Sequence, residues 1–479
     1  MRTALNPRAR EKYNLTMPKL PAALTLLLAL CLSVAVACDP TTAGDKPAPA
    51  RATTAAAVEA PPAPPPPAPP IPAGWYKGNL HTHSLWSDGD DYPEHIARWY
   101  RDRGYHFLGI SDHNTAQTGD KWVKFADVHK KGAGPATDRY LKDAELKPQS
   151  RGDRKEGTQE IRLAPFDEYR PLFEKPGQFI LIQAEEISDK FEKRPVHMGG
   201  INVAEPIKPA GGKSVPEIIT ANLRAVKEQG KRLNRPTLAH LNHPNFQWGV
   251  TAEELAQAVE ERFFEVYNGH PTVNQLGDPN GPATRPSIDR LWDIANTMRL
   301  TSLKSAPLFG IGTDDSHSYH VPGMSRATPG RGWTVVRAKS LSTETVLAAL
   351  EAGDFYASTG VVLRDVQFDA AAKKLSIDIA PTDTAKYMTQ FVGTRLPAGV
   401  KPGDYKPAPS EVGVVLATVE GVNPSYTLKG DELYVRAVVN SSLNPAVPSF
   451  KTQKQQAWTQ PIGWEHHLLT KTGNGIQLK

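Results

Sequence analysis

The chain carries histidines and acidic residues in short motifs whose spacing suits a metal site. His81 and His83 flank a single threonine, and alternate residues of an extended segment share one face, so both imidazoles can reach the same ion. Alone, this motif is also typical of ordinary surface histidines. Further ligand types follow along the chain at Asp88, Asp112, His113, Glu185, Glu186, His197, His243, Glu265, Asn268, Asp314, Asp315 and His317. Carboxylates and imidazoles gathered in this way suit Zn, Mn or Fe and hydrolytic chemistry.

The cysteine content excludes a thiolate version of such a site. Of the 479 residues, only Cys31 and Cys38 are cysteines, and both lie in the N-terminal region. The rest of the chain can therefore hold neither a disulfide nor a thiolate metal site, and any metal must be held by His, Asp or Glu.

The elements that must position these residues are predicted to be alternating strands and helices. Short apolar runs predict strands at 75–81, 105–111, 179–187, 196–203, 237–241, 263–267 and 308–312. A helix is expected over 93–103, with a proline at its start and Gly104 just past its end. Capping boxes at Ser214 with Glu217 and at Thr251 with Glu254 predict two further helix starts.

Most of these strands are apolar on both faces, which is typical of buried parallel strands. If the strands are parallel around a barrel, their carboxyl ends meet at one mouth, and nearly every strand ends near a ligand type. The sequence thus predicts an α/β barrel over 75–360.

Two segments depart from this rhythm. Residues 116–177 form a long, charged insertion directly after the strand that ends at His113, and we expect either a lid or a surface insertion without a role. From residue 361 to 479 the pattern becomes alternating apolar and polar, with Pro, Gly and Asn between the runs. This pattern predicts a small β-rich C-terminal domain.

The N-terminal region is predicted to be a targeting signal followed by a linker. Residues 20–37 are almost wholly apolar, follow basic residues, and end at Cys38 in a motif that resembles a bacterial lipobox. We therefore expect residues 1–38 to be a lipoprotein signal peptide, and the protein to be exported and anchored through a lipid on Cys38, facing the periplasm or the cell exterior. A secreted protein without a lipid, or a simple membrane anchor, is the alternative. Residues 39–74 are rich in Ala and Pro and predict an extended linker.

The charge distribution gives no support to a nucleic-acid partner. The formal net charge is +5, but five basic residues and one acidic residue before Cys38 account for most of it. The remainder is close to neutral, which does not favour binding of long polyanions. A small-molecule ester is the expected partner.

Taken together, the motifs resemble the PHP superfamily, named for polymerase and histidinol phosphatase domains. The resemblance covers about residues 75–360 and depends on order, residue type and strand position together. It is most similar to the branch that includes carbaryl hydrolase, whose Asn-His-Pro and Glu-Val-x-Asn-Gly patterns match residues 242–244 and 265–269. The resemblance implies a distorted (β/α)7 barrel with two or three divalent metal ions at its mouth.

The resemblance also implies a ligand set. It assigns His81, His83, Glu186 and Asp315 to a first ion, with Glu186 bridging to a second ion. The second ion would be held with His197 and His243, and a third by Asp88, His113 and His317. Many family members have His where this chain has Asp88, so the number of ions stays open between two and three. Glu186 is preferred to Glu185 because the family pattern places the ligand directly before Ile-Ser.

Several residues are expected to act beside the ligands. A metal-bound water, or a nearby acid such as Asp314 or His240, would supply the proton for the leaving group, although a supporting or core role is also open for the two side chains. Glu265 and Asn268 would contact substrate or form a hydrogen-bonding pair at the strand end. Lys77 and Arg194 are further candidates for phosphate contact.

The function predicted from these residues is a metal-dependent hydrolase. A phosphoesterase acting on small phosphate esters through a metal-activated hydroxide is favoured. A carbamate or carboxyl-ester hydrolase would use the same site, because fold and ligands do not separate these substrates. A metal-binding envelope lipoprotein without catalytic activity is the third alternative, and the complete ligand set stands against it.

Overall fold

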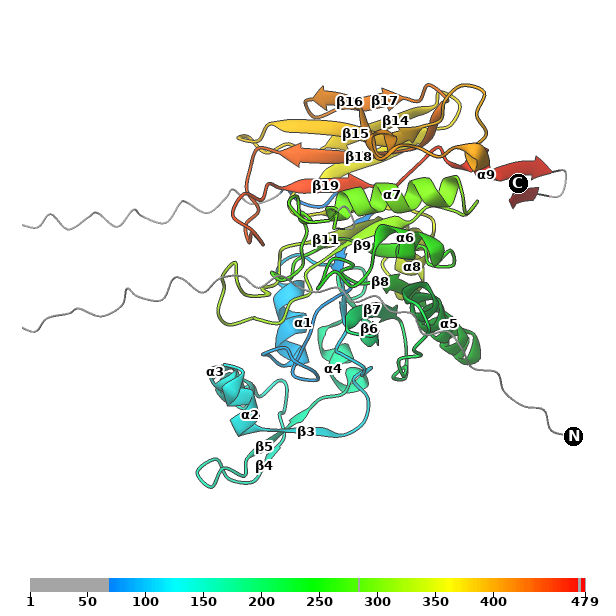
Figure 1. Cartoon of the computed structure of the whole chain (residues 1–479). Helices are drawn as coiled ribbons and strands as arrows, with labels where there is room; N and C mark the ends of the chain where they lie inside the picture. Colours follow the sequence, from blue (N-terminus) through cyan, green and yellow to red (C-terminus); the bar gives the residue numbers. More distant parts are fainter. Residues whose placement is uncertain (1–68, 283–284, 473–474, 479) are drawn as a thin grey trace, which may run out of the picture. The chain divides into compact units, whose positions relative to one another are not determined.

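A computed structural model describes residues 69–282, 285–472 and 475–478 (Figure 1). The predicted signal peptide, Cys38 and most of the linker lie outside these residues. Thirteen strands form the main sheet: β1 Trp75–Asn79, β2 Phe107–Ile110, β6 Ile180–Phe191, β7 Arg194–Ile201, β8 Leu238–Leu241, β9 Phe263–Asn268, β10 Phe309–Thr313, β11 Trp333–Arg337, β12 Phe355–Ser358, β15 Tyr387–Arg395, β16 Val414–Glu420, β18 Glu432–Ser441 and β19 Gln456–Thr459. The remaining strands are β3 Lys121–Lys124, β4 Ser150–Arg151, β5 Glu160–Leu163, β13 Leu363–Asp369, β14 Lys374–Ile379, β17 Ser425–Thr427, β20 Leu469–Thr472 and β21 Gly475–Leu478.

The helices occupy the connections between strands. They are α1 Pro93–Arg101, α2 Phe125–Lys130, α3 Gly134–Tyr140, α4 Phe166–Phe173, α5 Val215–Leu233, α6 Ala252–Gln257, α7 Ile288–Leu300, α8 Thr343–Glu351 and α9 Glu465–Leu468, with short 3-10 turns at Pro402–Asp404 and Pro409–Glu411. Among the described residues, none of the helices is both long and apolar enough to cross a bilayer.

The predicted helix starts are formed by the expected side chains. The Ser214 hydroxyl accepts a hydrogen bond from the Glu217 backbone N–H at the start of α5. Thr251 and Glu254 complete a reciprocal capping box at the start of α6. Each box satisfies backbone donors that the first helical turn leaves without a partner, which explains why these boundaries are readable from sequence.

The fold is mixed α/β, as predicted, and the main sheet has the strand order β10-β9-β8-β7-β6-β2-β1-β11-β12-β19-β18-β15-β16. A closed barrel is not seen: among the described residues, no backbone ladder joins β10 to β11. The sheet nevertheless bends back on itself beyond the strand ends. The Asp315 backbone N–H donates to the His81 carbonyl over 2.9 Å, and the His83 N–H donates to the Ser316 carbonyl over 2.9 Å. The segments that follow β1 and β10 therefore lie side by side.

The strands of the first half are not all parallel, which differs from the expectation. β1, β2 and β6 are parallel neighbours, and so are β8, β9 and β10, but β7 is antiparallel to both β6 and β8. A tight turn at Glu192, which has a φ of 56°, joins β6 and β7 as a hairpin. His197 therefore lies near the start of its strand, and the hairpin returns it to the edge where the other strands end.

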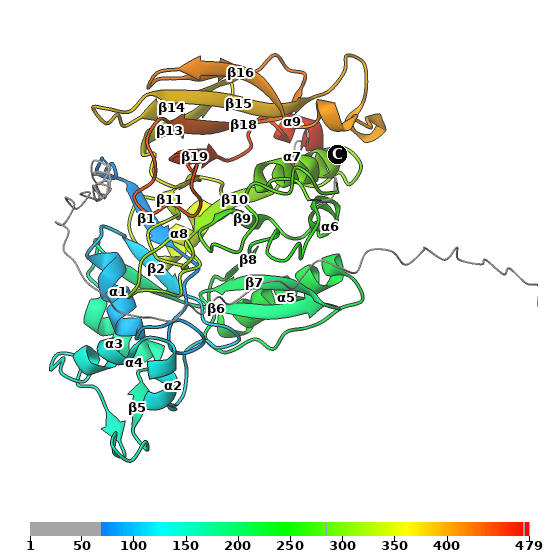
Figure 2. The same ribbon diagram turned by 60° about the vertical axis from the view of Figure 1, so that its left-hand side comes forward.

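The insertion at 116–177 has secondary structure and a small core of its own. β3, β5 and β4 form a sheet, and α2, α3 and β5 contribute Val128, Ala136, Tyr140 and Ile161 to a buried cluster. The same cluster contains Leu85 and Trp86, from the loop that carries Asp88. Figure 2 shows α4, at the end of the insertion, beside α1 and the strand β6. The insertion is thus packed against the loop that leads to Asp88.

The C-terminal strands extend the main sheet. β12 pairs with β19, and the sheet continues through β18 and β15 to β16, while β13, β14 and β17 form a separate sheet. Figure 1 shows α7 between β9 and these C-terminal strands. Inside this contact the Arg436 guanidinium, from β18, bonds the Asp293 carboxylate of α7 at 2.8 and 2.9 Å.

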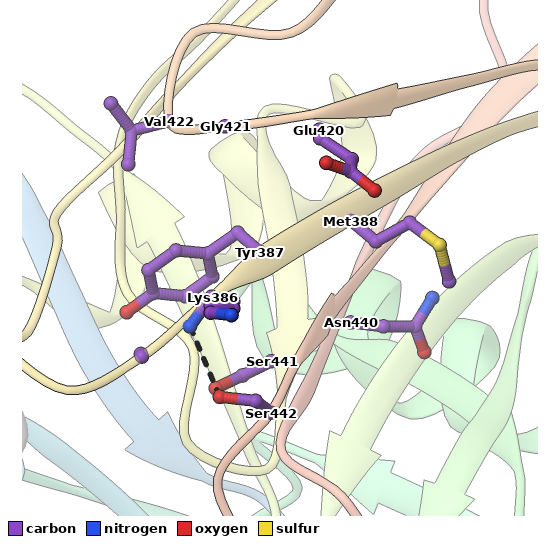
Figure 3. A pocket seen from close by; sticks show the side chains of 10 residues that line it. Lys386, Tyr387, Met388, Glu420, Gly421, Val422, Asn440, Ser441 and Ser442 are labelled. Carbon is purple, nitrogen blue, oxygen red and sulfur yellow. Dashed lines mark hydrogen bonds between the residues drawn. The ribbon is translucent and has the colours of Figure 1, made fainter.

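A cavity of about 510 Å³ lies at one end of the C-terminal strands, between β15, β18 and the end of β16. Lys386, Tyr387, Glu420 and Ser442 are among its lining residues, and the Lys386 backbone N–H donates to the Ser442 hydroxyl over 3.0 Å (Figure 3). None of the predicted ligands lines it. This cavity is therefore separate from the predicted metal site.

Lys77, one candidate for phosphate contact, is occupied within the fold. Its ammonium lies 3.8 Å from the centre of the Tyr105 ring and 3.9 Å from that of Trp333. Burial lowers the pKa of Lys77 from 10.5 to about 7, and the Asp314 carboxylate opposes this shift only in part. The Lys77 ammonium therefore contacts aromatic rings of the protein, and this contact accounts for the residue without a bound phosphate.

We expect Lys77→Met to stabilise the protein near pH 7 by about 2 kcal/mol, because it removes a charge that burial penalises. Because the pKa of Lys77 is lowered on folding, wild-type stability should rise between about pH 7 and 10.5 as the unfolded chain retains the proton. Urea unfolding of the metal-free protein over this range measures both effects. Equal pH profiles for the variant and the wild type would contradict this account.

Candidate metal centre

The structure brings all nine predicted ligands to one edge of the main sheet. They come from the ends of different strands: His81 and His83 after β1, Asp88 in the loop beyond them, His113 after β2, Glu186 within β6, His197 near the start of β7, His243 after β8, and Asp315 and His317 after β10. Adjacent strand ends place these side chains close together because the sheet bends so that the segments after β1 and β10 meet.

The Glu186 carboxylate lies at the centre of the cluster. Its Oε1 is 3.0 Å from His243 Nε2, 3.1 Å from His197 Nδ1 and 3.4 Å from His81 Nε2. Its Oε2 is 2.8 Å from His113 Nδ1, and the side chain is only 1% exposed. A carboxylate with imidazoles on both oxygens has the geometry of a group that bridges two ions.

Asp315 faces the first two histidines from the opposite strand end. Its Oδ1 is 3.2 Å from His83 Nε2 and 3.4 Å from His81 Nε2. The residue has a φ of 48°, in the left-handed region that is uncommon for a non-glycine side chain. Backbone in this region is strained and is held by its surroundings, here by the bond from the Asp315 N–H to the His81 carbonyl.

Asp88 forms a more open part of the cluster. One carboxylate oxygen is 3.3 Å from His317 Nε2 and 3.5 Å from His83 Nδ1, and the other is 3.5 Å from His113 Nε2. The Asp88 side chain is 54% exposed, whereas His83 is fully buried. This part of the cluster is the one that faces solvent.

The donor atoms fit divalent metal ions. Four groups of side chains offer ligand atoms that all lie within 4.8 Å of one another: His83, Asp88, His113 and His317; His81, His243 and Asp315; His81, His83 and Glu186; and His113, Glu186 and His197. His81 Nε2 and His83 Nε2 are only 3.1 Å apart, so their lone pairs need a proton or a cation between them. The all-nitrogen and oxygen set suits Zn, Mn or Fe.

The electrostatics of the cluster also favour bound cations. Burial alone would raise the pKa of Glu186, but the imidazoles of His81 and His197 hold it well below its usual range. Burial would likewise raise the pKa of Asp315, and His81 again holds it low. Burial lowers the pKa of His83. The two carboxylates are therefore ionised, and positive charge beside them, from imidazolium rings or bound cations, balances them in a buried site.

A buried carboxylate orients His81. Glu265, on β9, accepts a hydrogen bond from His81 Nδ1 at 2.6 Å, and its other oxygen accepts from the His243 backbone N–H at 2.7 Å. The Asn268 amide donates to both Glu265, at 2.8 Å, and Asp315, at 3.1 Å. Because Glu265 is fully buried, the structure favours the strand-end hydrogen-bonding role for this pair over substrate contact.

We expect Glu265→Gln to weaken divalent metal binding by about 10- to 100-fold, since the carboxylate orients His81 and raises the basicity of its ring. Titration of the metal-free protein with Zn²⁺ or Mn²⁺ measures the dissociation constant. Glu261→Gln is the matched control, because Glu261 is also buried but bonds the backbone N–H groups of Arg262 and Phe263. Equal affinity in Glu265→Gln and the wild type would refute this role.

Asp112 holds the loop that leads to Asp88. Its carboxylate accepts from the Ser84 backbone N–H at 2.8 Å, from the Ser84 hydroxyl at 2.6 Å and from the Ser87 hydroxyl at 2.5 Å. Gln117, at the start of the insertion, also donates to it at 2.6 Å. Asp112 thus supports neighbouring residues and is not part of the metal-ligating groups of the described residues.

Asp314, expected as a proton donor, is used by the fold instead. Its carboxylate accepts from the backbone N–H groups of Gly330, Arg331 and Gly332 at 2.6 to 2.8 Å, and from the Tyr100 hydroxyl at 2.7 Å. These four bonds occupy a fully buried carboxylate. These bonds to the 330–332 loop favour the supporting role that was the alternative for Asp314, and proton delivery by this residue stays a prediction.

His240, the other proton-donor candidate, is buried beside the cluster. Among the described residues, neither of its ring nitrogens has a hydrogen-bond partner. Burial lowers the pKa of His240 to about 4, so its ring is neutral near pH 7. The ring packs so closely that a Cβ on Gly199 would lie 2.2 Å from its Nε2. His240 therefore fits a core role better than a proton-transfer role.

Two other candidates are also occupied. Glu185 lies on the opposite face of β6 from Glu186 and accepts from the Ile207 backbone N–H at 2.7 Å, as the period of a strand requires. Arg194 makes a two-pronged pair with Glu254 at 2.7 and 2.9 Å. Neither side chain belongs to the metal-ligating groups of the described residues.

The structure adds residues that the motifs did not single out. His270 lies beside His317, with ring centroids 5.3 Å apart. The centroid of the Phe246 ring lies 5.1 Å from that of His243 and 6.3 Å from that of His197. The signal for both was their place in the sequence: each follows a strand end within three residues of a ligand or its support, Phe246 after His243 and His270 after Asn268.

No protein-family model and no curated protein matches the chain. One similar solved structure is a two-domain protein from Bacteroides vulgatus ATCC 8482 containing a predicted PHP-like metal-dependent phosphoesterase. The two chains are 17% identical, with 83% of this chain and 98% of that chain covered and a TM-score of 0.37.

A second similar structure, from Bifidobacterium adolescentis ATCC 15703, is described as a "putative metal-dependent phosphoesterase". It is 14% identical, with 52% of this chain and 89% of that chain covered and a TM-score of 0.27. TM-scores this low do not support a functional assignment. The function is therefore inferred from the side chains of the cluster.

Proposed function

We propose that the protein is a metal-dependent phosphoesterase of the PHP superfamily, with a distorted form of the superfamily's barrel, acting on small phosphate esters. The observation that carries this proposal is the cluster of nine His, Asp and Glu side chains around Glu186. Bound divalent ions would supply Lewis acidity and lower the pKa of a water molecule to near neutrality. Two or three ions of Zn, Mn or Fe match the donor set.

The residues of the chain have separable roles in this proposal. Glu186 and Asp315 provide the ionised carboxylates that hold cations in a buried site, and Glu265 keeps the His81 ring in place. Asp88 lies at the solvent-facing part of the cluster, where a substrate oxygen can approach. No serine or cysteine nucleophile is needed for hydrolysis at such a site.

The direct test is turnover of p-nitrophenyl phosphate by the purified chain reconstituted with Mn²⁺ or Zn²⁺, beside an Asp315→Ala variant. Metal-dependent turnover that vanishes in the variant supports a phosphoesterase. Bound metal without phosphate-ester turnover would overturn it, and hydrolysis of p-nitrophenyl acetate or an aryl carbamate would then support the carbonyl-ester alternative, with which the Glu265–Gly269 pattern is compatible. Bound metal with no hydrolysis of any of these would favour a non-catalytic metal-binding protein.

We further propose that the chain is exported and anchored in a membrane through a lipid on Cys38. The apolar stretch before Cys38 and the small residues next to it support this proposal. Membrane fractionation of cells that express the chain or a Cys38→Ala variant tests it: release of the variant from the membrane fraction supports anchoring, and retention of the variant argues against it.

A further inference from the structure

His270 lies at the same edge of the sheet as the ligands. It follows the end of β9, where its backbone N–H donates to the Asn268 side-chain oxygen over 2.8 Å. This bond anchors the segment to the residue that also contacts Glu265 and Asp315. The His270 ring meets the His317 ring at 71°, with centroids 5.3 Å apart. The side chain is therefore directed at the metal cluster by a fixed backbone.

The tautomer of His270 follows from its neighbours. The Thr272 backbone N–H lies 3.3 Å from His270 Nδ1, and the Thr272 hydroxyl lies 2.8 Å from the same atom. A backbone N–H can only donate, so Nδ1 must be the acceptor. In the neutral ring the single hydrogen is then on Nε2.

This tautomer makes a metal-ligand role for His270 unfavourable. A ligating Nε2 would need its lone pair, which would move the hydrogen to Nδ1 and set it against the Thr272 N–H. In agreement with this, none of the four metal-ligating groups of the described residues includes His270. Its Nε2 also makes no hydrogen bond with any residue that the structure describes. The ring thus offers one N–H donor that the protein itself does not use.

An apolar wall accompanies this donor. The Phe246 ring meets the His270 ring at 79°, with centroids 6.3 Å apart, and also packs against His243 at 5.1 Å. A donor beside an aromatic ring matches an ester that has a charged phosphoryl oxygen and an organic group. A hydrogen bond to a charged oxygen is also stronger than one between neutral groups.

We propose that His270 is a substrate-contacting residue, whose Nε2–H donates a hydrogen bond to a phosphoryl oxygen of the ester bound at the metal cluster. This inference rests on the proposed phosphoesterase function. It assigns His270 a task that differs from that of the nine ligands, because His270 holds substrate and no ion.

The test is binding of inorganic phosphate to the Mn²⁺-loaded full chain, measured by titration calorimetry without any turnover. His270→Ala should weaken phosphate binding about tenfold or more, since a hydrogen bond to a charged group is lost. The content of bound Mn²⁺, measured by mass spectrometry, should stay equal to that of the wild type. His129→Ala is the matched control, because His129 is an exposed histidine of α2, stacked on Phe125, and it should bind phosphate as the wild type does.

A second variant separates the hydrogen bond from the shape of the ring. His270→Gln keeps an N–H donor at a similar reach and should bind phosphate within about threefold of the wild type. Phosphate binding by His270→Ala equal to that of the wild type would overturn the role of His270 and leave the phosphoesterase proposal in place. Equal loss in both variants at full Mn²⁺ content would overturn the hydrogen-bond account. If the Mn²⁺-loaded wild type binds no phosphate, the inference is refuted, and turnover of p-nitrophenyl phosphate decides the proposed function separately.

Discussion

Replacing Glu186 with glutamine should remove both metal binding and hydrolysis. The carboxylate faces His113, His197 and His243 within 2.8 to 3.1 Å, so no other single side chain contacts as much of the cluster. Neutral glutamine cannot balance the charge of two cations or bridge them. Because the ions supply several kcal/mol of transition-state stabilisation, we expect kcat/KM for p-nitrophenyl phosphate to fall by about 1000-fold or more. Metal content by mass spectrometry should fall in parallel.

Glu185→Gln is the matched control for this experiment. Glu185 is adjacent in sequence and equally buried, but it lies on the other face of β6 and bonds the Ile207 N–H. Burial raises the pKa of Glu185 to about 8, so its carboxyl is largely protonated near pH 7 and glutamine resembles it closely. This variant should keep its metal and activity. Full metal content in Glu186→Gln would show that the cluster is not the metal centre.

Removing the Asp293 carboxylate should cause the largest loss of stability. Asp293, on α7, pairs with Arg436 of β18 and accepts the Tyr434 hydroxyl at 2.7 Å, and Arg436 is almost fully buried. In Asp293→Ala the guanidinium keeps only Asp289, at 3.1 Å, as a charged partner. Breaking a buried pair in this way costs about 3 to 5 kcal/mol. Urea unfolding monitored by tryptophan fluorescence and circular dichroism measures this cost.

The exposed pair of Arg364 and Asp378 provides the comparison. Its side chains are 47% and 40% exposed, so Asp378→Ala should cost less than about 1 kcal/mol. Since β18 and β19 belong to the main sheet, the Asp293→Ala variant should still unfold in one cooperative transition. Two separate transitions would show instead that the C-terminal strands fold independently of the part that carries the metal centre.

The local elements of the fold could be predicted from the sequence because short-range physics determines them. The helix starts at Ser214 and Thr251 depend on side chains that bond the backbone three residues away. The strands at 263–267 and 308–312 were predicted from apolar runs that are typical of buried segments. The structure has β9 and β10 at these positions. The spacing of His81 and His83 likewise implies a shared face, and the two rings do meet.

The direction of β7 could not be predicted, since a run of apolar residues does not indicate whether the strand runs parallel or antiparallel to its neighbours. The short turn at Glu192 makes a hairpin, and only the pairing of β6 with β7 brings His197 back to the ligands. The same limit applies to His270, which directly follows the 265–269 pattern but whose neighbour, His317, lies 47 residues later in the chain and after a different strand.

The sequence by itself determined the chemical types available for the site, because residue identity and local spacing set which atoms can bind a cation. The resemblance already named Glu186 and Asp315 as ligands, but only the tertiary structure shows what directs these side chains into the cluster and their neighbours away from it. Asp314 and Asp315 are equivalent in type, yet the positive φ of Asp315 turns one carboxylate toward His81 and His83 while the other accepts the N–H groups of the 330–332 loop. Side-chain direction depends on backbone conformation and on partners distant in sequence, and neither is encoded in a local motif.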